Sequence, residues 1–303
     1  VTDGDIRRHI IAKNDLNSEV GSFMNPDPVF IYPDAPRKTA VSIMNAKDLL
    51  ALPVLDEHQR ILRVEPLYFS HFYNIPVLLM AGGFGKRLLP LTTNTPKPMI
   101  SVGGKPILEH VIENLMGYGF REFYISTHYL PDIITKHFRD GKQWGVSIKY
   151  IHEEQPLGTA GALGFMADLN HKSILVLSGD VIVDLDFGEM IHFHYSTGSK
   201  VTVATQFQEY NVPFGVLIAE NDKIVGITEK PTFRHMVNTG IYVLSGSVAG
   251  EVVRGQRTDM TDVIGQALEK GELVSAFVFD GLWKDVGHKK NLEELNSHMK
   301  MNN

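Results

Sequence analysis

The sequence contains no cysteine among its 303 residues. This absence excludes disulfide bonds, thiolate metal sites and cysteine nucleophiles, and it removes any positive sign of an oxidising compartment. Long hydrophobic runs are missing too. The apolar stretch at 75–81 is far shorter than the ~20 residues that span a bilayer, and the first residues lack a signal-peptide pattern. We therefore expect a cytoplasmic protein without a membrane-spanning segment.

Basic residues are not in excess either. The sequence has 29 Lys and Arg against 35 Asp and Glu, a formal charge of −6, and this argues against a nucleic-acid-binding protein built on a basic face. With 43% hydrophobic residues the chain can form a packed core, and its length suits about two domains. It begins at Val1 in a pattern typical of the middle of a domain, which indicates a fragment or a processed form of a longer protein.

Residues 1–66 predict a small α/β module. A short strand is expected at 29–31 and a helix around residues 40–44, where apolar residues recur at helical spacing. Two further strands are expected at 52–55 and 61–64, joined by a polar turn. The aromatic-rich stretch that follows, at 67–74, predicts a connector packed on something rather than a loose linker.

The order of elements in this module resembles the second repeat of a CBS-domain pair. The opening Thr2-Asp-Gly-Asp5 resembles the motif with which the end of a first CBS repeat holds a nucleotide. The resemblance implies a regulatory adenine nucleotide at Thr2 and Asp5, with most of the first repeat upstream of Val1. A structural appendage without a ligand is the alternative. CBS modules commonly pair, so a homo-oligomer is also expected.

Residues 75–303 predict a single larger domain, because strands and helices alternate along them. That rhythm is typical of a mixed, mainly parallel α/β sheet of Rossmann-like type, flanked by helices. The expected strands are 76–80, 123–126, 147–151 and 174–177, and the expected helices are 107–116, 132–138 and 160–169. In the helix at 107–116 the apolar residues share one face, which indicates packing on a sheet.

A Gly-rich turn follows the first strand of this domain, at residues 81–88. Such a turn at the carboxyl end of a strand is typical of phosphate binding, because glycines let backbone N–H groups approach an anion closely. A dinucleotide fingerprint is excluded by Leu88 in place of its third glycine, and a Walker A loop by Arg87 where Ser or Thr is required. The cations Lys86, Arg87 and Lys97 suit a triphosphate.

The stretch 81–108 is similar to the signature of the sugar-1-phosphate nucleotidyltransferases, whose fold is GT-A-like. The similarity continues, in the family's order, through five further motifs: Pro156-Leu-Gly-Thr-Ala-Gly161, Ser178-Gly-Asp180, Glu229-Lys-Pro231, Asn238-Thr-Gly240 and Trp283-Lys-Asp-Val-Gly287. Lys86 departs from the family, which usually has Thr or Ser there. The resemblance implies that a sugar phosphate attacks the α-phosphorus of a nucleoside triphosphate and that pyrophosphate leaves, with Mg²⁺ as cofactor.

The same resemblance assigns roles to individual residues. The catalytic residues would be Arg87 on the β- and γ-phosphates, Lys97 at the α-phosphate, and Asp180 and Asp285 as the pair that carries Mg²⁺. The nucleotide would be bound by Ala81, Gly82, Gly83, Gly85, Lys86, Glu153, Gly158 and Thr159. The sugar phosphate would be held by Glu229, Lys230, Asn238 and Gly240.

Two neighbouring carboxylates are candidates for recognising the nucleotide base. Glu153 precedes Gly158 by five residues, and a carboxylate accepts two hydrogen bonds, which suits the adjacent N1–H and N2–H₂ donors of guanine. This favours GTP. Glu154 could equally be the reader, and either side chain could simply be solvated.

Two other functions remain as alternatives. Asp184-Leu-Asp186 after a strand could hold a metal and a nucleotide sugar, as in a glycosyltransferase, although Asp186 fits better as the N-cap of a helix at 187–195. A non-catalytic nucleotide sensor is the third possibility. The sugar-1-phosphate nucleotidyltransferase is preferred over a glycosyltransferase because the latter would not need the Gly-rich turn, Lys97 and Lys230. It is preferred over a sensor because every proposed catalytic position carries a competent residue.

Overall fold

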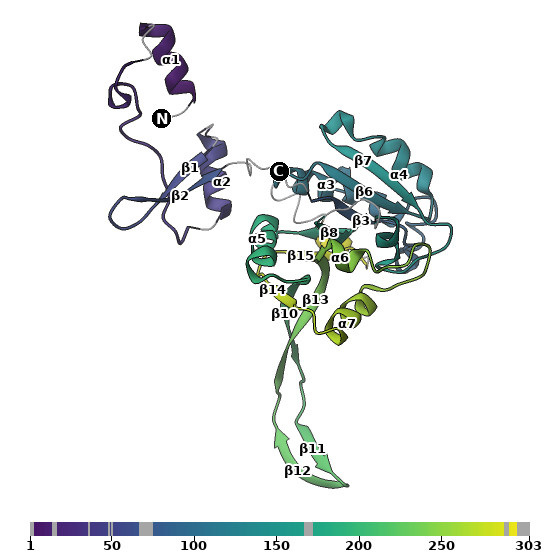
Figure 1. Ribbon diagram of the computed structural model, residues 1–303. Coiled ribbons are helices and arrows are strands. Elements are labelled where there is room, and N and C mark those ends of the chain that lie inside the picture. The colour runs from purple at the N-terminus through teal and green to yellow at the C-terminus, as the bar shows by residue number, and fades with distance from the viewer. Residues whose placement is uncertain are drawn as a thin grey trace. The chain divides into compact units, whose positions relative to one another are not determined.

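A computed structural model describes residues 3–13, 17–35, 37–47, 49, 51–66, 75–166, 172–287 and 291–295 (Figure 1). The chain divides into two compact units, Val1–Tyr68 and Phe69–Asn303. The connector expected at 67–74 lies outside the described residues. In the described part no helix is long and apolar enough to cross a membrane.

The first unit contains α1 (Asp3–Lys13), η1 (Val20–Ser22), α2 (Arg37–Ala46), β1 (Ala51–Leu55) and β2 (Ile61–Pro66), with β1 and β2 antiparallel. Its core includes Ala40 and Met44 of α2 packed with Leu52 and Val54 of β1. The strand expected at 29–31 is reduced to a single bridge to Val54, because the segment is flanked by prolines, which cannot donate to a ladder.

The second unit is built on a seven-stranded sheet in the order β14-β10-β13-β8-β3-β6-β7. Its strands are β3 (Val77–Met80), β6 (Glu122–Thr127), β7 (Ser147–His152), β8 (Ser173–Ser178), β10 (Val201–Asn211), β13 (Thr232–Ser245) and β14 (Val274–Val278). Within this sheet β13 is antiparallel to its two neighbours, and all other neighbouring pairs are parallel. The expected mixed, mainly parallel sheet is therefore confirmed.

Helices cover both faces of this sheet. Val77 and Leu79 of β3 pack into one cluster with α3 (Ile107–Gly117), α4 (Pro131–Phe138) and α5 (Phe187–Thr197), whereas Leu78 packs into a second with α6 (Gly246–Ala249) and α7 (Met260–Glu269). A central strand buried on both faces has to be apolar throughout, which is why β3 reads Val-Leu-Leu-Met. Asp186 caps α5, as the sequence predicts, because its carboxylate accepts a hydrogen bond from the Glu189 N–H.

The prediction of a helix at 160–169 is wrong. The structure has a short 3₁₀ helix there, η5 (Gly161–Phe165), and residues 167–171 lie outside the described part. The physical reason is tertiary: a Cβ on Gly164 would lie 2.8 Å from the backbone of Arg254, so the segment is pressed against a distant part of the chain.

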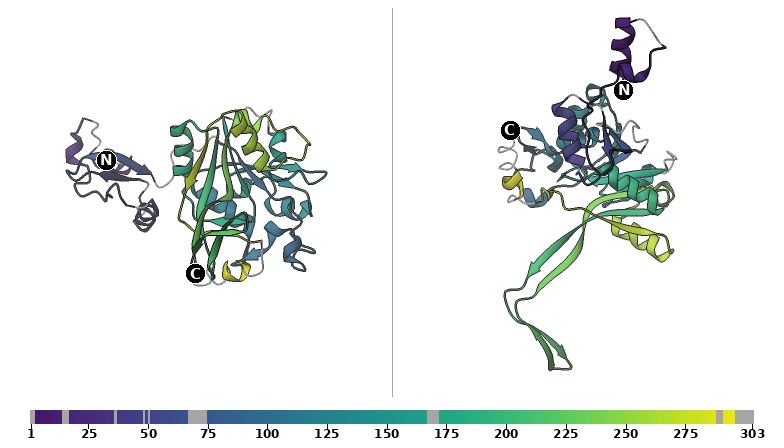
Figure 2. Two further views of the ribbon diagram at one scale, coloured as in Figure 1. Left: turned by 90° about the horizontal axis from the view of Figure 1, so that it is seen from below. Right: turned by 90° about the vertical axis from the view of Figure 1, so that its left-hand side faces the viewer.

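The remaining elements connect these layers or extend beyond them. They are η2 (Lys86–Leu88), η3 (Lys97–Met99), β4 (Ser101–Val102), β5 (Lys105–Pro106), η4 (Lys142–Trp144), β9 (Val181–Val183), β11 (Val216–Glu220), β12 (Lys223–Thr228) and β15 (Trp283–Asp285). The hairpin of β11 and β12 continues the outer parts of β10 and β13 away from the sheet (Figures 1 and 2). Residues 291–295 are helical.

Candidate functional site

The Gly-rich turn leaves the carboxyl end of β3, where the sequence places it. Gly85 has φ +62°, and a Cβ there would lie 2.8 Å from Thr92 Cγ2 and 3.1 Å from Lys97 Cβ. Backbone conformation and space therefore both require glycine. After it, buried Leu88 anchors η2 while Lys86 and Arg87 remain exposed.

A pocket of about 260 Å³ lies beside this turn. Eight of the predicted site residues line it: Ala81, Gly82, Gly83, Lys97, Glu153, Gly158, Thr159 and Asp180. They come from four separate segments, at the ends of β3, β7 and β8 and in η3. Gly85 and Lys86 lie in the same turn without lining the pocket.

Lys97 joins two carboxylates at the edge of the pocket. Its ammonium forms an ion pair with Asp180 and donates to Asp285 Oδ1 at 2.9 Å. The Ser178 hydroxyl donates to the other carboxylate oxygen of Asp180. β15 pairs with β9, which places Asp285 opposite Val181 and so beside Asp180.

Arg87 lies at the same place. A Cβ built on Gly287 would lie 3.3 Å from Arg87 Nη2 and 3.1 Å from Asp285 Oδ2, so the guanidinium and this carboxylate flank one backbone position. The four residues predicted to be catalytic are thus brought together. In the described ranges no third carboxylate or histidine joins Asp180 and Asp285 in a metal-binding cluster.

Glu153 is buried in the wall of the pocket, with 3% of its surface exposed. One carboxylate oxygen accepts from the Leu157 N–H at 3.0 Å, whereas Oε1 has no hydrogen-bond partner among the described residues. A buried acceptor without a partner is costly. Glu154, the other candidate, is exposed and does not line the pocket.

The loop at Gly158 and Thr159 is held by a residue that the sequence analysis missed. Asp259 Oδ1 accepts from the Thr159 N–H at 3.0 Å, and the Met260 N–H donates to Thr159 Oγ1. Gly158 has φ +81°, and a Cβ there would lie 2.6 Å from the Thr258 carbonyl. Asp259 also forms a capping box with Asp262 at the start of α7. That Asp-x-x-Asp pattern was the available signal, but it predicts only the helix end.

The residues predicted to hold the sugar phosphate are divided between two places. Asn238 and Gly240 lie at the sheet, where the Trp283 indole donates to the carbonyl of the intervening Thr239. Gly240 has φ +77°, so its backbone conformation alone accounts for the glycine. Glu229 and Lys230 are exposed beyond the sheet, between β12 and β13, and do not line the pocket.

The residues predicted to bind a regulatory nucleotide belong to the first unit. Thr2 lies outside the described residues. Asp5 lies in α1, where its carboxylate accepts a hydrogen bond from Arg8 at 2.6 Å.

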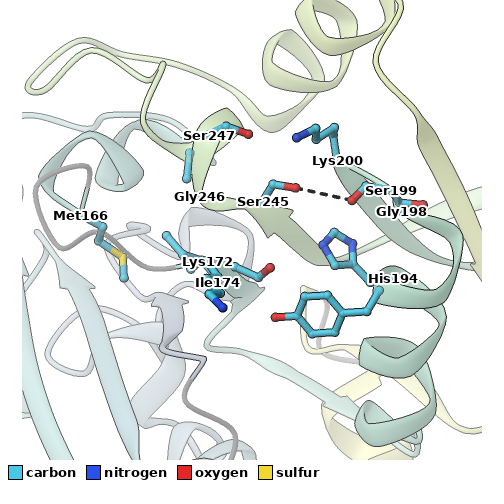
Figure 3. Close-up of a pocket in the computed structure, with 13 residues that line it drawn as sticks. Met166, Lys172, Ile174, His194, Gly198, Ser199, Lys200, Ser245, Gly246 and Ser247 are labelled. Carbon is cyan, nitrogen blue, oxygen red and sulfur yellow. Dashed lines mark hydrogen bonds between the residues drawn. The ribbon is translucent and has the colours of Figure 1, made fainter.

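A second pocket, of about 460 Å³, contains none of the predicted residues (Figure 3). His194 of α5 lines it together with Lys172 and Lys200, and the Ser245 hydroxyl donates to the Ser199 carbonyl there. His194 is buried and its Nδ1 bonds Thr202 Oγ1 at 2.8 Å. Burial lowers the pKa of His194 to about 4, so the imidazole is neutral in the folded protein at neutral pH.

Comparisons with known proteins identify the family of the chain. A family model described as Nucleotidyl transferase matches residues 76–302, and a CBS domain model matches residues 20–64. The chain belongs to the nucleotidyl transferase family. The resemblance noted in the sequence is therefore confirmed at the level of the family and of the CBS domain.

Two curated relatives are mannose-1-phosphate guanylyltransferases. The catalytic subunit beta of Xenopus tropicalis is 33% identical over 221 residues, which is 70% of this chain and 61% of the relative. A probable mannose-1-phosphate guanylyltransferase 1 of Oryza sativa subsp. japonica is 33% identical over 222 residues, with the same coverage. The chain thus spans about three fifths of the length of these relatives.

Solved structures share the fold of the second unit. A putative glucose-1-phosphate thymidylyltransferase from Bacillus anthracis, in complex with a sucrose, has a TM-score of 0.60 and 26% identity, and the match covers 75% of this chain and 95% of that one. HddC from Yersinia pseudotuberculosis has a TM-score of 0.59 and 24% identity, over 74% of this chain and 99% of that one, which is a likeness of fold alone.

We expect Asp259→Ala to weaken the binding of a nucleoside triphosphate about tenfold, because the Gly158–Thr159 loop loses its charged acceptor. The same change should lower the free energy of unfolding by about 1 kcal/mol through loss of the cap. Asp262→Ala is the matched control: it breaks the same capping box from the other side and should cost stability without changing affinity. Calorimetric titration and urea unfolding measure the two effects. Equal affinity losses in both variants would show that Asp259 acts only as a cap.

His194 should make the stability of the protein fall in acid. Because its folded pKa lies below the unfolded value of 6.5, the unfolded chain binds the proton first, and stability is lost as pH drops from about 6.5 towards about 4. The loss is on the order of 3 kcal/mol. His194→Asn should flatten this part of the urea-unfolding profile, whereas His192→Asn, an exposed change on the same helix, should leave it unaltered. Parallel profiles for the wild type and His194→Asn would refute the assignment.

Proposed function

We propose that this chain transfers a guanylyl group from GTP to a sugar 1-phosphate and releases pyrophosphate. The observation that carries the proposal is the meeting of Lys97 with Asp180 and Asp285 at the edge of the pocket beside the Gly-rich turn. The family supports the class of reaction, and the names of the relatives point to GTP and make mannose 1-phosphate the first acceptor to test.

The reaction is an in-line substitution at the α-phosphorus. An oxygen of the sugar phosphate forms a bond to this phosphorus as the bond to the bridging oxygen of pyrophosphate breaks. No covalent intermediate on the protein is needed, so the residues bind, orient and neutralise charge. Backbone N–H groups of the turn and Arg87 would hold the β- and γ-phosphates, and Lys97 would stabilise the charge that shifts to the leaving pyrophosphate.

Charge orients the nucleotide in the pocket. Lys97 and Arg87 both lie beside Asp285, and Lys86 belongs to the same Gly-rich turn as Arg87, which suits the triphosphate. The buried Glu153 carboxylate would repel phosphates and would instead face the base. Its unpartnered Oε1, together with Oε2, offers two acceptors to the N1–H and N2–H₂ donors of guanine.

The donor set at Asp180 and Asp285 fits Mg²⁺. Nucleotidyltransferases generally use a divalent metal, and Mg²⁺ is commonly held by one or two carboxylates together with substrate phosphates rather than by an all-protein cage. Both side chains reach the same ammonium group, so their oxygens already converge. When bound, the ion would neutralise phosphate charge and orient the α-phosphate.

The glycosyltransferase alternative lacks this support. Its Asp-x-Asp motif would need both carboxylates for a metal, but Asp186 caps α5 through the Glu189 N–H and Asp184 is exposed. The sensor alternative would leave the charged cluster around Lys97 without a use.

The direct test measures pyrophosphate release with Mg²⁺, using four nucleoside triphosphates against mannose, glucose and heptose 1-phosphates. We expect GTP to be preferred.

Glu153→Gln should reduce kcat/KM for GTP about 10- to 100-fold, because an amide cannot accept from both guanine donors. Glu154→Gln, one residue away and exposed, is the control and should act like the wild type. No turnover with any pair would contradict the proposal, and a loss confined to Glu154→Gln would move the base contact to that residue.

A further inference from the structure

The pocket beside His194 lies at the other end of the sheet from the pocket beside the Gly-rich turn. Ser173 and Ile174, at the start of β8, line it. Ser178 and Asp180, at the end of β8 and just beyond, line the other pocket. Five residues of strand separate the two ends of β8, a distance of roughly 17 Å. Because ligands of open α/β sheets bind at the carboxyl ends of the strands, the pocket beside His194 is separate from the candidate active site.

The charged side chains that line this pocket are cations. They are Lys172 and Lys200, and no Asp or Glu lines the pocket in the part of the chain that the structure describes (Figure 3). Neither lysine is paired with a carboxylate among the described residues. In a chain with a formal charge of −6, a pocket whose charged lining is cationic attracts anions.

The backbone holds the two lysines on either side of one strand end. The Ser245 N–H donates to the Lys200 carbonyl at 2.8 Å. The next N–H, that of Gly246, donates to the Lys172 carbonyl, also at 2.8 Å. Since neighbouring strands lie about 4.8 Å apart, the backbones of the two lysines are roughly 10 Å from each other. Two long, flexible lysine side chains can reach one anion across that gap, and the anion would offset their mutual repulsion.

Uncharged polar groups without a protein partner line the same pocket. His194 is 2% exposed; its Nδ1 bonds Thr202, and its Nε2 has no hydrogen-bond partner among the described residues. The hydroxyl of Ser173, a residue that is also 2% exposed, has none there either. Neither atom is completely enclosed by protein, so each is open to the pocket. Buried polar groups are paired with protein, water or a ligand, so the partner of these two atoms has to lie in the pocket.

The volume of the pocket sets the size of its occupant. About 460 Å³ lies within the range of small-molecule sites. A phosphoryl group between the lysines would fill only part of this space. The imidazole and the serine hydroxyl suit a body that carries hydroxyl groups, and the side chains of Met166 and Ile174 suit the C–H face of a sugar ring.

We propose that this pocket is a second small-molecule site, which binds a phosphorylated compound of the size of a sugar phosphate. The phosphoryl group lies between Lys172 and Lys200, and hydroxyl groups of the compound pair with Ser173 and with His194 Nε2. The pocket shares no lining residue with the pocket beside the Gly-rich turn, so this proposal does not depend on the proposed function.

A single thiol tests this binding at the pocket itself. Because the chain has no cysteine, Ser247→Cys places the sole thiol on an exposed residue that lines the pocket. The rate of its reaction with neutral iodoacetamide reports whether the pocket is filled. We expect mannose 1-phosphate to slow this reaction about tenfold when its concentration exceeds the Kd about tenfold. Mannose, which lacks the phosphoryl group, should not slow it.

Inorganic phosphate, added alone, separates two sources of the anion. Protection as strong as that by mannose 1-phosphate would support a site for the phosphoryl anion itself. Weaker protection would support a site that also contacts the sugar.

Matched double variants in the Ser247→Cys background test the lysines. Lys172→Ala/Lys200→Ala should abolish the protection, because the phosphoryl group loses both cations. Lys142→Ala/Lys223→Ala removes the same charge from exposed positions that do not line the pocket, and it should keep the protection. All four lysines are exposed, so both double variants should unfold in urea as their parent does.

Unchanged thiol reactivity with both mannose 1-phosphate and inorganic phosphate would overturn the proposal. Protection of equal strength in the two double variants would overturn it as well, since the phosphoryl group would then bind elsewhere. A wild type that releases no pyrophosphate but shows the expected protection would reject the proposed function and leave this second site supported.

Discussion

The ion pairs of Lys97 with Asp180 and Asp285 hold together three segments that are far apart in the sequence. Lys97 and Asp180 are largely shielded from water, and two carboxylates this close would repel each other without the ammonium between them. Removing one partner of such a cluster costs more than the attraction alone, because the remaining charges stay partly buried. Lys97 therefore links η3, the end of β8 and the strand β15 through its two ion pairs.

The charged residues around the pocket are arranged on opposite sides of it. The cations lie beside the Gly-rich turn, and the buried Glu153 lies in the wall formed after β7, so the pocket has a cationic side and a carboxylate side. The proposed function assigns the triphosphate to the first and the base to the second. The start of α7 secures the opposite wall through Asp259.

Much of this could be predicted from local pattern. The apolar run of β3, the one-sided face of α3 and the cap at Asp186 depend on neighbouring residues, and each is found where the sequence predicts it. The helix at 160–169 failed because Gly164 packs on the backbone of a segment ninety residues away. Asp259 was missed for the same reason, since its contact with Thr159 spans 100 positions. No pattern in Glu229-Lys-Pro231 tells whether its hairpin folds over its own chain or extends away from it.

The proposed orientation of the nucleotide can be tested with a structure of the chain bound to a non-hydrolysable GTP analogue and Mg²⁺. We expect the triphosphate against residues 82–87 and Lys97, with the guanine edge on the carboxylate of Glu153. A nucleotide bound in the opposite direction, with its base beside Asp180 and Asp285, would contradict the proposed site, as would a nucleotide bound only in the pocket beside His194.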